Sequence, residues 1–157
     1  MGKAGESTEI MEVQGQWEKI EVIVDSGAVE TVGPQRVGGA FEVKENAKSK
    51  SGFKYVVANR QEIPNWGEKH LQGYGGEWNP LNMCMQVTDV KKVLASVGRM
   101  CDGGNRVVFD DWSGSYIENK RTGEKTPLIK KNGIYTFDLW TKGGGSSKEP
   151  DKEQDGS

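Results

Sequence analysis

Short strand-like runs separated by Gly, Asn, Asp and Ser dominate the middle of this chain, and they restrict it to a sheet-based fold. The Asn132-Gly133 pair adds a specific signal, because Asn-Gly favours a tight hairpin turn, here one that links residues 128–129 to residues 134–136. Little of the sequence carries a helical period. We therefore predict an all-β domain with strands at 18–24, 40–43, 53–58, 83–87, 106–109, 115–119 and 134–139.

The length of the chain limits it to one modest domain. With 157 residues, of which 34% are hydrophobic, it cannot build two independent cores. We expect a flexible N-terminal segment at 1–13, a folded domain at 14–140 and a disordered, charged tail at 141–157. The five tryptophans are expected to pack mainly in the core.

Composition excludes several classes of function. A net charge of −2 gives no electrostatic footprint for nucleic acid. No apolar run is long enough to span a bilayer, and the first residues do not read as a signal peptide. We expect an intracellular, cytoplasmic protein that binds neither nucleic acid nor membrane through this domain.

The junction at residues 20–28 is the strongest functional signal. The strand-forming run Ile20–Val24 leads directly into Asp25-Ser26-Gly27-Ala28, so an apolar strand delivers a carboxylate to a tight turn. Gly27 has no Cβ and would allow another backbone to approach closely. The junction resembles the catalytic turn of aspartic proteases.

A second apolar segment supports this interpretation. Residues 94–99 run through Val97, Gly98 and Arg99, and residues 99–102 are expected to form a short helix that Gly103-Gly104 ends. Retropepsins contain such an apolar-Gly element beside the catalytic loop.

At family level, the chain resembles the retropepsin-like aspartic protease region of copia-type retrotransposon polyproteins, from the protease toward the segment that precedes integrase. The resemblance covers roughly residues 17–140. It is carried by the segments DSGA at 25–28, YVVAN at 55–59, QVTDV at 86–90, SVG at 96–98, VVF at 107–109 and NGIY at 132–135.

The resemblance implies an all-β, retropepsin-like acid protease barrel with a short helix after the second apolar-Gly element. It implies an aspartic endopeptidase that needs no cofactor and cleaves extended polypeptides as a homodimer, with one Asp25 from each copy. Ser26 would brace the opposite loop, Gly27 would lie against substrate backbone, and Ala28 would pack beneath the site. Many retroviral proteases have acidic residues at both positions after the alanine, whereas this chain has Val29-Glu30, so an ion pair from Arg99 to the loop would use Glu30.

Retropepsins also close over substrate with a β-hairpin flap. Residues 43–53 are the best candidate, because strand-like residues flank the small polar tip Lys48-Ser49-Lys50-Ser51-Gly52. An ordinary exposed loop is the competing interpretation of the same segment.

Other chemistry has weaker support. Cys84, Cys101 and the single histidine, His70, do not have the spacing of a structural zinc site, so no metal is predicted and the thiols are expected to be reduced and partly buried. No serine or cysteine nucleophile motif is present, and the Gly-rich residues 73–76 lack the partners of a phosphate-binding loop. The main alternative is a catalytically inactive, transposon-derived β domain that binds peptide or protein partners. A nucleic-acid-binding fragment is disfavoured by charge.

Overall fold

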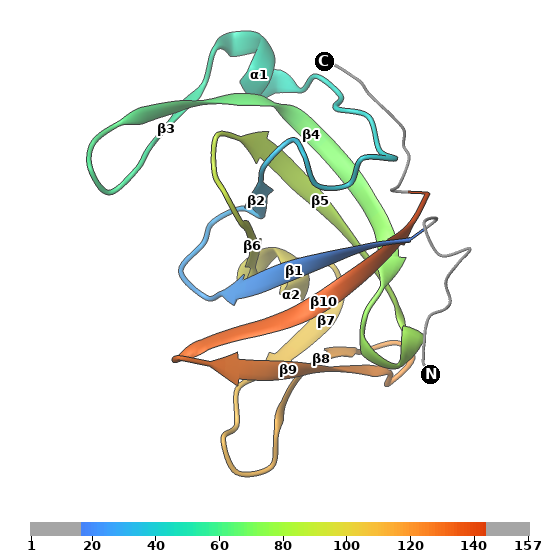
Figure 1. Ribbon diagram of the computed structural model, residues 1–157. Coiled ribbons are helices and arrows are strands. Elements are labelled where there is room, and N and C mark those ends of the chain that lie inside the picture. The colour runs from blue at the N-terminus through green and yellow to red at the C-terminus, as the bar shows by residue number, and fades with distance from the viewer. Residues whose placement is uncertain (1–16, 144–157) are drawn as a thin grey trace.

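The computed structural model describes residues 17–143, and these residues form one continuous sheet of ten strands (Figure 1). Strand residues outnumber helical residues by 52% to 11%, which confirms the all-β prediction. The order across the sheet is β3-β4-β5-β2-β6-β1-β10-β9-β8-β7. The elements are β1 (Trp17–Asp25), β2 (Val32–Gly33), α1 (Ala47–Ser51), β3 (Lys54–Val56), β4 (Glu62–Tyr74), η2 (Gly76–Trp78), β5 (Pro80–Thr88), β6 (Val93–Ser96), α2 (Val97–Asp102), β7 (Asn105–Val108), β8 (Ser115–Asn119), β9 (Lys125–Lys131) and β10 (Ile134–Lys142).

Strand β1 is central to the sheet. It pairs antiparallel with β10 along most of its length and parallel with β6 over its last four residues. Its alternating side chains Ile20, Val22 and Val24 are buried, as expected for a strand with one face on a core. Because β1 is paired on both sides, its C-terminal end is held firmly at the point where Asp25 emerges.

Strands β4 and β5 form a long antiparallel hairpin that the sequence did not reveal as such. Its inward positions on β4 are Ile63, Asn65, Gly67, Lys69 and Leu71, so polar residues and a glycine interrupt the apolar alternation. The buried polar groups are satisfied by tertiary contacts. The amine of Lys69, for example, donates to the carbonyl oxygens of residues 35, 37 and 38 at 2.6, 2.8 and 3.2 Å.

The C-terminal strands form consecutive hairpins, β7–β8, β8–β9 and β9–β10. The predicted Asn-Gly hairpin is confirmed, because Asn132 and Gly133 both have positive φ, at 52° and 80°, and Ile129 pairs with Thr136. Ile117, Leu128 and the inward residues of β10 join the side chains of β1 and β5 in one core.

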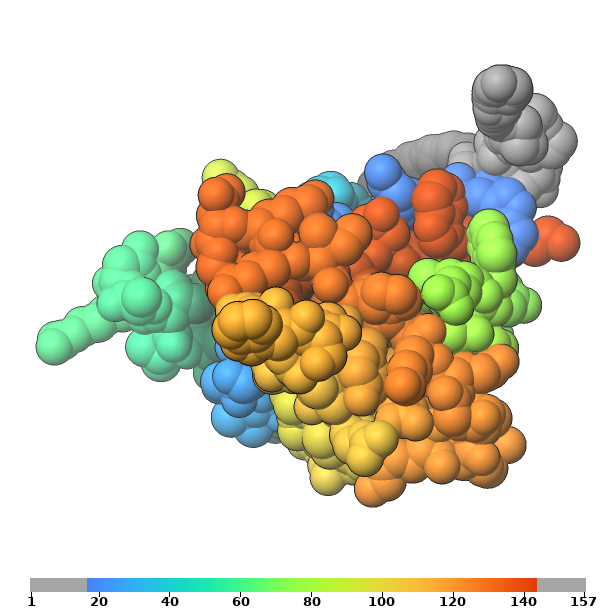
Figure 2. Space-filling view, turned by 90° about the horizontal axis from the view of Figure 1, so that it is seen from below, coloured from blue at the N-terminus to red at the C-terminus, as the bar shows by residue number. Residues whose placement is uncertain are grey.

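The predicted hairpin at residues 43–53 is wrong. Residues 47–51 form α1, with a capping box between Asn46 and Ser49 and a left-handed Gly52 after the last turn. Lys48, Ser49, Lys50 and Ser51 are therefore helical, and local capping explains why. A projecting hairpin does exist, but it is formed by β3 and β4 with its turn at residues 57–61 (Figures 1 and 2).

Several smaller expectations also need correction. Residues 40–43 are not a strand, since a turn from Gly38 to Phe41 bends the chain there. Both cysteines are exposed and free. Strand β10 continues to Lys142, two residues past the predicted domain boundary at residue 140.

The tryptophans do not form the core. Trp112 is 98% exposed. Trp17, Tyr74 and Trp78 pack edge to face where β4 turns into β5, and Trp140 packs against Trp78 in a tilted arrangement. The core consists mainly of Val, Ile and Leu side chains, together with Met85, Met100 and Phe137.

Candidate functional site

The Asp25 turn lies at the exposed end of β1. The carboxylate oxygen Oδ1 of Asp25 accepts a hydrogen bond of 2.8 Å from the backbone N–H of Gly27, which holds the side chain against its own turn. Ser26 and Gly27 are exposed, Ala28 is half-buried, and the apolar side chain of Val29 is 82% exposed. The turn therefore presents both a carboxylate and an apolar group at the surface of the protomer.

Gly27 has room for a side chain within the protomer. A Cβ there would meet only Oδ1 of Asp25, at 3.4 Å, and its φ lies outside the left-handed region. Any strict need for glycine at this position would therefore come from a molecule outside the protomer, such as substrate or a second copy.

The second apolar element lies directly beside this turn. Asp25 is paired with Ser96 in the parallel ladder between β1 and β6, and Ser96 is also the N-cap of α2. Its hydroxyl accepts from the backbone N–H of Arg99 at 3.1 Å and donates to the carbonyl of Val29 at 3.4 Å. One fully buried serine therefore connects the Asp25 turn to the helix.

The predicted short helix is confirmed, and Gly103 ends it as expected. Its start differs from the prediction. The strand ends at Ser96, so Val97 and Gly98 occupy the first turn of α2 rather than the end of β6. Ser96 stops the strand because its side chain caps the helix.

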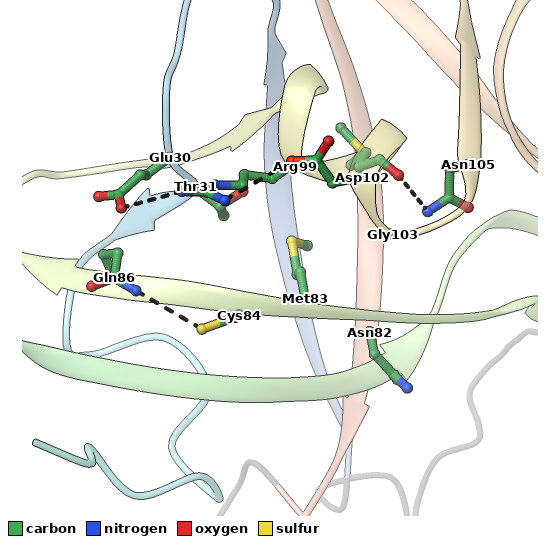
Figure 3. Close-up of a pocket in the computed structure, with 11 residues that line it drawn as sticks. Glu30, Thr31, Asn82, Met83, Cys84, Gln86, Arg99, Asp102, Gly103 and Asn105 are labelled. Atoms are coloured by element: carbon green, nitrogen blue, oxygen red, sulfur yellow. Dashed lines mark hydrogen bonds and ion pairs between the residues drawn. The ribbon is translucent and has the colours of Figure 1, made fainter. Parts of the chain in front are cut away.

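The predicted ion pair between Arg99 and Glu30 is present, with 3.6 Å between Nη2 and Oε2 (Figure 3). Glu30 is only 14% exposed and has two further partners. It accepts from the hydroxyl of Tyr55 at 3.1 Å and from the amine of Lys48. Lys48, from the segment predicted to be the flap, thus contacts the loop that follows Asp25 from its place on α1.

Tyr55 connects this loop to the base of the projecting hairpin. Its hydroxyl accepts from Asn65 at 3.1 Å, and Asn65 in turn donates to Gln86 at 2.9 Å. The pKa of Tyr55 is raised to about 12, mainly by burial and partly by the neighbouring Glu30, while the hydrogen bond from Asn65 acts in the opposite direction. Sequence reasoning did not find Asn65 or Gln86, because only the pairing of β4 with β5 brings them together.

A surface pocket opens beside this network, between β5 and α2. Glu30, Thr31, Cys84, Gln86, Arg99 and Asn105 are among its lining residues (Figure 3). Asp25 does not line it. The pocket is therefore a neighbour of the Asp25 turn and not its centre.

The protomer supplies one free carboxylate at the turn. Glu30, the next acidic residue after Asp25 along the chain, is already engaged by Arg99, Lys48 and Tyr55. A reaction that needs two facing carboxylates would therefore require a second copy of Asp25.

Comparison with known proteins found no matching family model, no matching curated protein and no matching solved structure. Within residues 17–143, no helix is long and apolar enough to cross a membrane.

Proposed function

We propose that this protein is a retropepsin-like aspartic endopeptidase that cleaves extended polypeptides as a homodimer. The observation that carries the proposal is the position of Asp25 in an exposed turn, at the end of β1 and in parallel register with Ser96, from which α2 starts. A strand that delivers the aspartate, a second strand beside it and a helix leading away form the arrangement expected for a retropepsin-like domain.

The reaction would use two Asp25 carboxylates related by a two-fold axis. Two like charges held about 3 Å apart cannot both ionise, so the pair would share one proton and titrate as a unit. The ionised carboxylate would take a proton from a trapped water, and the protonated one would donate to the scissile carbonyl oxygen. Water attacks directly, so no covalent intermediate forms.

The surroundings of the turn support this assignment. Val29 is 82% exposed in the protomer, and contact with a second copy or with a substrate side chain would cover it. The turn of the β3–β4 hairpin projects from the body of the protomer, and Val56 near that turn is 69% exposed. This hairpin would act as the flap that holds an extended peptide and excludes water. The network from Glu30 through Tyr55 to Asn65 would hold its base.

Cleavage of a mixed peptide library tests the proposal. We expect cleavage between about pH 4 and about pH 7, the range of a dyad with one shared proton, and inhibition by a statine-type transition-state mimic. Asn keeps the shape of the side chain but cannot form the titrating pair, so Asp25→Asn should lower the rate at least about 100-fold.

A matched control is Asp111→Asn, since Asp111 is an exposed aspartate that contacts Lys130 and Tyr135 on the C-terminal hairpins. This variant should cleave like the parent protein. Circular dichroism and sedimentation should show the same fold and the same oligomeric state for both variants. Undiminished proteolysis by Asp25→Asn would contradict the assignment of Asp25.

The alternative is a peptide-binding β domain without catalysis. It would gain support if the protein were dimeric, bound extended peptides and cleaved none of them under these conditions.

A further inference from the structure

Three side chains that can ligate a metal gather on the outer face of the β4–β5 hairpin, and none of them belongs to the Asp25 turn. Glu68 and His70 lie two residues apart on β4, and Cys84 lies directly opposite His70 on β5. Their ligand atoms, a carboxylate oxygen, an imidazole nitrogen and a sulfur, all lie within 4.8 Å of one another. Residues two apart on a strand share a face, so the sheet itself brings the three side chains together.

Polar neighbours orient Glu68 toward the other two ligands. Its Oε1 accepts from Nδ2 of Asn46 at 2.8 Å and from Nε2 of Gln86 at 3.3 Å. The remaining oxygen, Oε2, lies 2.7 Å from Nε2 of His70. One carboxylate oxygen is thus held by amide donors while the other faces the imidazole, as in sites where outer partners orient a ligand.

We propose that Glu68, His70 and Cys84 bind a divalent transition metal of the Zn²⁺ class, with a water as fourth ligand. Zinc bonds to nitrogen and oxygen are about 2.0 to 2.2 Å and those to sulfur about 2.3 Å, so tetrahedral ligand atoms lie roughly 3.2 to 3.8 Å apart. The ligand atoms now lie within 4.8 Å of one another, with Oε2 of Glu68 and Nε2 of His70 at 2.7 Å, so metal binding would require the exposed side chains of His70 and Cys84 to rotate. His70 is 54% exposed, which leaves an open path for entry.

The mixture of ligands selects the class of metal. A thiolate and an imidazole favour Zn²⁺, Co²⁺ or similar ions, whereas Mg²⁺ and Ca²⁺ prefer an all-oxygen site. The thiol must lose its proton to water as the metal–sulfur bond forms. Without a metal this is difficult, because burial and the neighbouring Glu68 raise the pKa of Cys84 to about 11. The charge of the bound ion would reverse that effect.

A cobalt titration of the reduced, full-length protein tests this site. Co²⁺ bound to a thiolate gives an intense near-ultraviolet charge-transfer band, and tetrahedral coordination gives visible bands. We expect both to saturate at one equivalent of Co²⁺ and to disappear when Zn²⁺ is added. Zn²⁺ should also raise the melting temperature of the protein in a concentration-dependent way.

The two cysteines provide a matched pair of variants. Cys84→Ser should lose the thiolate band, whereas Cys101→Ser, which alters the other exposed cysteine, should keep it. His70→Gln should weaken binding at least about tenfold. Because these side chains are exposed, the variants should fold normally, which circular dichroism would verify.

The proposal is overturned if no Co²⁺ band appears at millimolar metal, or if Cys84→Ser and His70→Gln both bind as tightly as the parent protein. Glu68→Gln provides a further check, since it keeps the hydrogen-bonding shape but removes the charge. These tests use metal binding and do not depend on proteolysis.

Discussion

At the scale of single residues, Glu30 connects three separate elements of the fold to the Asp25 loop. Its carboxylate joins the Asp25 loop to α2 through Arg99, to α1 through Lys48 and to the projecting hairpin through Tyr55. The sequence indicated the first of these partners, because Val29 leaves Glu30 as the only acid next to the turn. The contacts with Lys48 and Tyr55 depend on how distant segments pack, and no local sequence pattern predicts them.

We expect Glu30→Gln to lower the free energy of unfolding by about 1 to 3 kcal/mol, because a mostly buried carboxylate with three partners loses its charge. Glu62→Gln is the control, since Glu62 on the β3–β4 hairpin is 62% exposed and its ion pair with Lys54 is long, at 3.9 Å. That change should stay within about 0.5 kcal/mol. Urea denaturation of both variants measures the difference, and equal effects would show that the Glu30 contacts add little.

At the scale of secondary-structure elements, some elements follow from local sequence signals, whereas others form only because of tertiary contacts. The Asn132-Gly133 hairpin and the stop of α2 at Gly103 follow from turn and capping preferences, so the sequence predicted them. Strand β4 has no such signature, because Asn65, Gly67 and Lys69 occupy its inward face. Its existence depends on partners in β5 and in the loop at residues 35–38.

Substitution of Gly67 tests the importance of the register shift in β4. It lies at a register shift with φ of 123°, and a Cβ there would come within 2.4 Å of the carbonyl oxygen of Lys44. Gly67→Ala should therefore destabilise the protein by at least about 1 to 3 kcal/mol. Gly103→Ala is the control, because its φ is −83° and the nearest atom would be at 3.5 Å. Similar melting temperatures for the two variants would contradict the strain at Gly67.

At the scale of the whole molecule, the protomer carries one Asp25 turn, so the proposed activity belongs to a pair of protomers. The sequence has a single Asp-Ser-Gly, and within the described residues Glu30 is occupied by its own partners. Assembly and catalysis should therefore be inseparable.

Mixing parent protein with Asp25→Asn protein tests this dependence. After exchange of subunits with a ninefold excess of the variant, most parent subunits would sit in heterodimers, so activity per parent subunit should fall to about a tenth. Excess Asp111→Asn protein is the control and should cause no such loss. Activity that stays constant per parent subunit would mean that one copy of Asp25 is sufficient.

The sequence alone determined the features that short-range physics controls. Apolar alternation made β1 a strand that ends at Asp25, the apolar segment with its following glycines produced β6 and α2, and Asn-Gly made the last hairpin. These are choices between local conformations, which neighbouring residues decide.

Only the tertiary structure decided which distant groups meet. It placed the projecting hairpin at β3–β4 while local capping made residues 47–51 a helix, and it gathered Tyr55, Asn65 and Gln86 around one polar network. It also placed His70 directly opposite Cys84 in the ladder between β4 and β5. Such contacts depend on strand register and on the burial of polar groups against partners far along the chain, and no short stretch of sequence contains that information.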